Sequence, residues 1–192
     1  AVADGFITPL DAGNLLQFHP GPPARWRFLV SAGDNRTVEV ELTAAMPPGA
    51  NATVLEFYRM DGQPAQGTVL SKNKSFFLTV RVDIEDRDFH SETKLDEPAY
   101  RYFEEHAREL PDKIGFAFEP TADKRMEVQA SGGNYHHDFE WSRDIAHPVE
   151  ASRGHAEGGD ACSPGWFELP LTPGESVRLT TSVGGLASSS LQ

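Results

Sequence analysis

The sequence of 192 residues contains one cysteine, Cys162. A single cysteine cannot form an intramolecular disulfide, so a reducing compartment, and with it a cytoplasmic location, is the expected environment. No apolar run approaches about 18 residues, so no membrane-spanning helix is predicted. The start of the chain also lacks the charged and apolar regions of a signal peptide.

Basic residues are few compared with acidic ones. The chain carries 17 Lys and Arg against 29 Asp and Glu, for a formal net charge of −12. Such a balance disfavours nucleic acid and anionic membranes as partners, because both are negatively charged. It is compatible with a neutral ligand such as a polysaccharide.

Metal-binding spacings are also absent. Potential ligands gather late in the chain, at His136, His137, Asp138, His147, His155, Asp160 and Cys162. Adjacent histidines on a strand point to opposite faces, however, and no C-x2-C or H-x3-H spacing supports zinc. Nothing marks Cys162 as an activated nucleophile. We therefore predict no metal, no cofactor and no catalytic residue, and a metal-dependent binding protein is the least favoured alternative.

Short alternating segments separated by turn residues dominate the rest. In the clearest of them, Phe76, Leu78, Val80, Val82 and Ile84 face one side. Strands are expected at residues 25–31, 38–43, 53–60, 76–84, 114–119, 125–130, 135–141, 166–171 and 176–182. This pattern predicts an all-β fold, an antiparallel β-sandwich. One short inserted helix is expected at residues 98–110, where Tyr102, Phe103, His106 and Leu110 share a helical face.

The sandwich is expected to span residues 25–184, after an irregular lead-in at residues 1–24 and before a frayed tail at residues 185–192. Residues 142–164 show no sustained period and are predicted to form a long loop. Loops of this length are uncommon and are usually functional or disordered. We expect this loop to lie at one end of the sandwich, on the same side as residues 87–90.

Two blocks carry a resemblance to a known family. One comprises Phe139-Glu140-Trp141, Glu150, Arg153-Gly154, Ser163-Pro164-Gly165 with Phe167, and residues 171–175, which read Leu-Thr-Pro-Gly-Glu. The other comprises Arg81 and then Arg87-Asp88-Phe89-His90-Ser91. In this order they resemble the amino-terminal domain of bacterial and archaeal glycogen debranching enzymes of the amylo-α-1,6-glucosidase type. The resemblance covers roughly Trp26 to Val183 and matches poorly between Lys94 and Gly132.

The resemblance implies a β-sandwich that is part of a large supersandwich beside a helical-barrel glycoside hydrolase domain. It places the family's first part and its catalytic domain outside this chain. The implied function is a non-catalytic domain that packs on the barrel and helps to shape an α-glucan site during glycogen catabolism. The parent protein would be a glycoside hydrolase, while this segment alone would be inactive. An autonomous α-glucan-binding module is the alternative.

Candidate contacts with the glucan or the barrel are Arg87, Asp88, His90, Trp141, Glu150, Arg153 and Trp166. Each also has a structural explanation. The favoured explanation of Arg87 is as the partner of a carboxylate, and tryptophan on an alternating strand is more often a core or interface residue. Arg153 is expected to donate to a carboxylate, with Glu150 the nearest in sequence. Gly154 is expected to permit a backbone turn that a side chain would obstruct.

Overall fold

A computed structural model describes residues 8–62, 66–88 and 91–184. The expected tail at residues 185–192 and the candidate residue His90 lie outside the described residues. The described chain forms strands with two helices, and no helix in it is long and apolar enough to cross a membrane. The predicted all-β sandwich is confirmed, with one helix more than expected.

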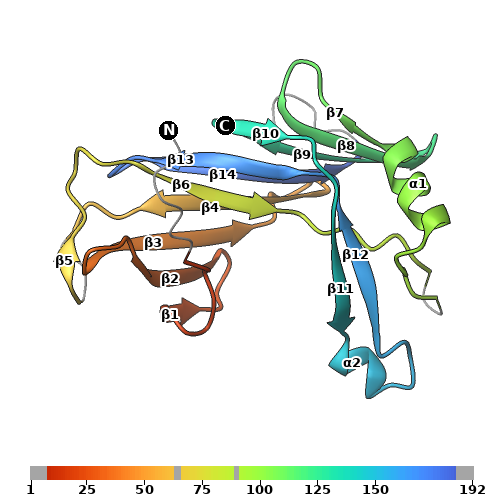
Figure 1. The fold of residues 1–192 in the computed structure, drawn as a ribbon, viewed down its shortest axis with the longest axis horizontal. Helices are drawn as coiled ribbons and strands as arrows, with labels where there is room; N and C mark the ends of the chain where they lie inside the picture. Colours follow the sequence, from red (N-terminus) through yellow and green to blue (C-terminus); the bar gives the residue numbers. More distant parts are fainter. Residues whose placement is uncertain (1–7, 63–65, 89–90, 185–192) are drawn as a thin grey trace.

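The larger sheet has nine strands and forms one layer of the sandwich (Figure 1). Eight of them follow the order β1-β2-β3-β4-β14-β9-β8-β7, and β5 pairs with β3 off this path. The bounds are β1 Leu15–His19, β2 Ala24–Ser31, β3 Arg36–Ala45, β4 Ala52–Arg59, β5 Thr68–Val69, β7 Ala107–Glu109, β8 Ile114–Thr121, β9 Lys124–Ala130 and β14 Ser176–Val183. All neighbours are antiparallel except β3 and β5.

A sheet of three strands forms the second layer and packs on part of the large sheet. Its order is β10-β13-β6, with bounds Asn134–His136, Trp166–Leu171 and Phe76–Arg81. The core forms where the two sheets face each other. Phe116 from the large sheet lies 6.3 Å, between ring centroids, from Phe167 of the small sheet, and both side chains are fully buried. Burial of such aromatic side chains is the main stabilising term of the sandwich.

Alternation decides which side chains reach this core. Along β6 the residues are half-buried and exposed in turn, so that Phe76 faces inward and Phe77 is 59% exposed. The predicted strand at residues 76–84 ends earlier than expected, because β6 stops at Arg81. Ile84 then forms an isolated antiparallel bridge with Cys162. The chain therefore leaves the small sheet at Arg81 and pairs, through Ile84, with the segment that contains Cys162.

Apart from the hairpin at residues 140–163 described below, three strands were not predicted. β1 lies within the segment expected to be an irregular lead-in, and all five of its residues are exposed. β5 has only two residues, and β7 occupies residues expected to be helical. Each gains its strand conformation from hydrogen bonds to a neighbour rather than from its own sequence pattern.

Helix α1 spans Glu97–His106 and lies at one end of the sandwich (Figure 1). The Asp96 side chain accepts a hydrogen bond from the Ala99 N–H at 2.7 Å and caps the amino terminus. Phe103 is 1% exposed and stacks on Phe118 at 5.3 Å. The helix ends four residues before the predicted end because Ala107 pairs with Phe118 in the large sheet.

Residues 142–164 were predicted to form a loop, and this prediction is wrong. Strands β11 (Glu140–Ala146) and β12 (Gly158–Ser163) pair as an antiparallel hairpin, with the short helix α2 (Pro148–Ala151) between them. Figure 1 shows this hairpin projecting away from both sheets. We call residues 140–163 the arm.

Candidate functional site

The arm is held by a third segment that runs along β12. The backbones of Ile84 and Cys162 exchange two hydrogen bonds, at 2.8 and 2.9 Å. Further along, the Asp160 N–H donates to the Thr93 carbonyl at 2.7 Å. The described parts of residues 84–95 thus pass from the sandwich to the arm and back. This segment includes Arg87 and Asp88, so the expected proximity of the two candidate regions is confirmed.

Asp160 joins the arm to this segment through its side chain. One carboxylate oxygen accepts the Leu95 N–H at 2.7 Å and the other accepts the Asp144 N–H at 2.9 Å. These backbone hydrogen bonds lower the pKa of Asp160, because they favour the charged carboxylate. Asp144 has a positive φ of 53°, an uncommon conformation for a residue other than glycine. Asp160 therefore fixes the β-bulge in β11 between Ser142 and Ile145.

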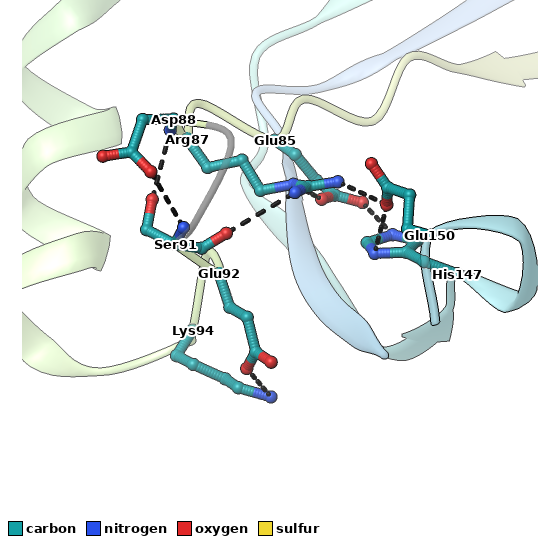
Figure 2. A network of polar contacts seen from close by, with 8 residues as sticks. All are labelled: Glu85, Arg87, Asp88, Ser91, Glu92, Lys94, His147 and Glu150. Carbon is teal, nitrogen blue, oxygen red and sulfur yellow. Dashed lines mark hydrogen bonds and ion pairs between the residues drawn. The ribbon is translucent and has the colours of Figure 1, made fainter. Parts of the chain in front are cut away.

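Four side chains next to α2 form what we call the Arg87 network: Glu85, Arg87, His147 and Glu150 (Figure 2). Arg87 Nε donates to Glu85 Oε2 and Arg87 Nη2 donates to Glu150 Oε2, each at 2.8 Å. The hydrogen bonds to Glu150 and then to Glu85 raise the pKa of Arg87. Only 16% of the Arg87 side chain is exposed, so these pairs are better shielded from solvent than ordinary surface ion pairs.

His147 closes the network on its far side (Figure 2). Its Nε2 atom lies 2.9 Å from Glu85 Oε1 in hydrogen-bonding geometry. Its Nδ1 atom lies 3.2 Å from Glu150 Oε2, which is close enough for an ion pair, but the geometry does not form a hydrogen bond. A hydrogen bond requires directional alignment as well as proximity. Nδ1 is therefore a buried atom without a hydrogen-bond partner among the described residues.

Asp88 pairs with Ser91. Its N–H donates to Ser91 Oγ at 3.1 Å, and its Oδ1 atom accepts the Ser91 N–H at 2.8 Å. Arg87 Nη1 also donates to the Ser91 carbonyl, at 3.5 Å. These contacts link Ser91 to both Arg87 and Asp88 (Figure 2).

The carboxylate of Glu150 is paired with Arg87 and not with Arg153, which sequence proximity had suggested. The Arg153 side chain is exposed and forms no ion pair within the described part of the chain. Its backbone N–H donates to the Glu150 carbonyl at 2.9 Å, in the turn that ends α2. Gly154 has a φ of 76° there, which confirms the expected turn, because an L side chain is strained in this conformation.

The two candidate tryptophans face different surroundings. Trp141, on β11, packs edge-on against Phe103 at 5.3 Å and adjoins the core. Its Nε1 atom is buried without a hydrogen-bond partner among the described residues. Trp166, on β13, stacks on His136 at 3.9 Å and is paired across strands with Arg81. Both tryptophans are partly buried, and Trp141 packs against the core.

Sequence reasoning did not single out Glu85, His147 or Asp160 as parts of one site. The available signals were weak. Glu85 belongs to an acidic stretch, and His147 and Asp160 were noted only as separate potential metal ligands. Because Glu85 and His147 are 62 positions apart, only the folded arm brings them together. No group of three or more His, Cys, Asp or Glu is placed to hold a metal ion in residues 8–62, 66–88 and 91–184.

The geometry is suited to holding two chain segments together. Glu85 and Glu150 both face the Arg87 guanidinium, and charge-assisted hydrogen bonds of this kind are strong and directional. The network therefore positions the tip of the arm.

A family described as "Glycogen debranching enzyme N terminal" has a model that matches residues 2–178 of this chain. The match spans both sheets and the arm, and it confirms the resemblance carried by residues 81–91 and 139–175. A search of curated proteins finds no match.

Proposed function

Because the chain belongs to the glycogen debranching enzyme N-terminal family, we propose that it is a non-catalytic domain that packs on a helical-barrel hydrolase domain of the same protein. Its arm and the segment at residues 84–95 contact the barrel and help to shape the entrance of the α-glucan site. The parent enzyme acts in glycogen breakdown in the cytoplasm. The domain contributes a rigid surface and no reacting group.

The observation that carries this proposal is the arm with its Arg87 network. The hairpin projects away from the sandwich (Figure 1), yet its tip is tied to a second segment by the contact of Arg87 with Glu150 and by that of His147 with Glu85. A projecting hairpin without a function has no need of such bracing. Preorganised elements bind with less loss of conformational entropy, which favours contact with a partner surface.

The outer face of the small sheet offers a second contact area beside the arm. Trp166 is partly exposed there, and Arg81 forms an ion pair with Glu140 at the start of the arm. An aromatic ring next to a guanidinium is a frequent combination in protein interfaces. The proposal assigns Trp166 to the barrel or the glucan, and it assigns Trp141 to the core.

Hydrolase assays with the purified 192-residue chain test the non-catalytic assignment. We expect no release of glucose from a branched limit dextrin, since the proposed domain contributes no reacting group. Sustained release that follows the protein through successive purification steps would overturn the assignment.

The docking role is tested in the complete enzyme. Replacing Glu150 by Gln and Arg87 by Ala should each lower activity on limit dextrin, because the arm tip loses its fixed position. The exposed Arg153→Ala variant, on the same arm, separates bracing from direct contact: loss of activity with an unchanged arm would identify Arg153 as a residue that touches the barrel. Full activity of all three variants would contradict the proposed role of the arm.

A further inference from the structure

An open cavity of about 310 Å³ is lined by residues of β1, β2 and β3. These strands are neighbours at one edge of the large sheet (Figure 1). Sites for small molecules have volumes of roughly 300–1,000 Å³, so this cavity is large enough for a small ligand. Its lining residues come from strands other than those of the arm, and none of them takes part in the Arg87 network.

All three strands contribute polar side chains to the cavity, and the pairing register explains why. The lining includes Gln17 and His19 from β1, Arg25 and Arg27 from β2, and Glu41 from β3. Gln17 is opposite Arg27, which is opposite Glu41, and His19 is opposite Arg25. Residues opposite one another share a face of the sheet, so these side chains gather on one surface.

The charges around the cavity balance. Arg27 Nε donates to Glu39 Oε2 at 2.6 Å, so this guanidinium is already neutralised. Arg25 and Glu41 form no side-chain hydrogen bond or ion pair with the described residues, although both line the cavity. One free cation and one free anion therefore face the same space, which has no excess of either charge.

The uncharged groups also combine donors with acceptors. His19 Nδ1 accepts the Gly21 N–H at 3.2 Å, which places the proton of the neutral ring on Nε2 as a donor. The Gln17 amide offers both a donor and an acceptor. Pro22 and Pro23 add apolar ring surface to the wall.

A cavity of this kind fits a neutral ligand with many hydroxyl groups. Each hydroxyl can donate to Glu41 and accept from Arg25, and the apolar faces of a sugar ring can lie on the prolines. An anion would instead need an excess of donors and would be repelled by Glu41. We propose that this cavity is a carbohydrate-binding site for one or two pyranose units, separate from the arm. The assignment to a sugar rests on the lining, whereas the choice of an α-glucan rests on the proposed function.

Titration of the 192-residue chain with maltotriose, followed by two-dimensional NMR, tests this inference. Shifts should cluster on β1, β2 and β3, with a dissociation constant of about 1 mM, as befits a shallow polar site. Glu41→Gln and Arg25→Ala should each weaken binding about tenfold, because each removes a hydrogen bond to or from a charged group. Both side chains lack partners in the described chain, so circular dichroism should show unchanged folding. Arg101→Ala, at an exposed arginine of helix α1, is the matched control and should bind maltotriose normally.

The remaining outcomes separate this site from the proposed function. Equal binding of cellobiose would support a sugar site without α-glucan selectivity, and it would count against the glucan assignment alone. Absence of shifts with either sugar would overturn the carbohydrate site, while leaving the docking test of the arm independent. Shifts that appear with inorganic phosphate and not with sugars would also overturn it, since the cavity would then select anions. Loss of binding in Arg87→Ala but not in Glu41→Gln would assign the sugar to the arm instead.

Discussion

Arg87 and Glu150 are 63 positions apart, and their side chains meet at 2.8 Å next to the short helix of the arm. The contact joins a segment that leaves β6 to a helix that lies between β11 and β12. Because the arm extends away from the sandwich, this pair acts where the packing of the core does not reach (Figures 1 and 2).

Replacing Arg87 by Ala should loosen the arm more than the sandwich. The substitution leaves Glu85 and Glu150 close together without the cation between them. Amide exchange in residues 146–154 should accelerate about tenfold, because hydrogen bonds to a charged group are lost while the core remains folded. Hydrogen exchange measured by mass spectrometry checks this, with Arg153→Ala as the control that leaves the network intact. Equal acceleration in β4 and β14 would contradict a local role.

The stability of the chain should depend on Asp160 in the acidic range. The pKa of Asp160 is lowered in the folded protein, so its contribution to the free energy of unfolding is fully present above the pKa of the unfolded chain, about 3.9. The contribution is lost as the pH falls through the lower folded value, because the protonated carboxyl no longer accepts both N–H groups as strongly. Urea midpoints across this range should fall with pH less steeply in Asp160→Asn than in the unmodified chain. Parallel profiles would show that other carboxylates carry the dependence.

The thiol of Cys162 should be unreactive in the folded protein. The residue is fully buried, and burial raises the pKa of its thiol to about 12, so the nucleophilic thiolate is scarce at neutral pH. Labelling with a disulfide reagent should proceed only at the rate at which the chain opens, and rapidly in denaturant. Fast labelling under native conditions would mean that β12 detaches from Ile84 more readily than its backbone hydrogen bonds indicate.

Two phenylalanines on neighbouring strands of the small sheet should respond differently to truncation. Phe167 is fully buried, and replacing it by Ala should lower the free energy of unfolding by about 3–5 kcal/mol, as for other buried aromatics. Phe77 is 59% exposed, and the same replacement there should change it by no more than about 0.5 kcal/mol. Thermal or chemical denaturation measures both. A large loss for Phe77→Ala would reveal that a contact covers the outer face of this sheet.

The strands that could be predicted are those whose own residues alternate. Val38, Val40 and Leu42 point to one side of β3, and their spacing alone identifies the strand. The start of α1 was predicted at Pro98, one residue after its observed start, because proline is favoured in the first turn of a helix. The sandwich follows from these local patterns together with the scarcity of helical periods.

The arm was mistaken for a loop because β12 has no local signal. It reads Gly-Gly-Asp-Ala-Cys-Ser, without a β-branched or aromatic side chain, and its last five residues are buried. Small residues suit a strand that is covered by neighbours, and only tertiary contacts show that this one is. The pairing of Arg87 with Glu150 was hidden for the same reason. Sequence proximity suggested Arg153, but the fold of the hairpin decides which cation lies nearest.

A braced hairpin of this kind sets a distance. The seven residues of β11 extend by about 20 Å at the rise of an ordinary strand. Asp160 fixes the bulge in β11, and the ion pair of Arg87 with Glu150 holds the tip. The hairpin therefore acts as a spacer of defined length. A neighbouring domain that touched the tip would be held away from the sheets by this amount, and shortening β11 and β12 together by one residue pair would draw it closer by about 3 Å.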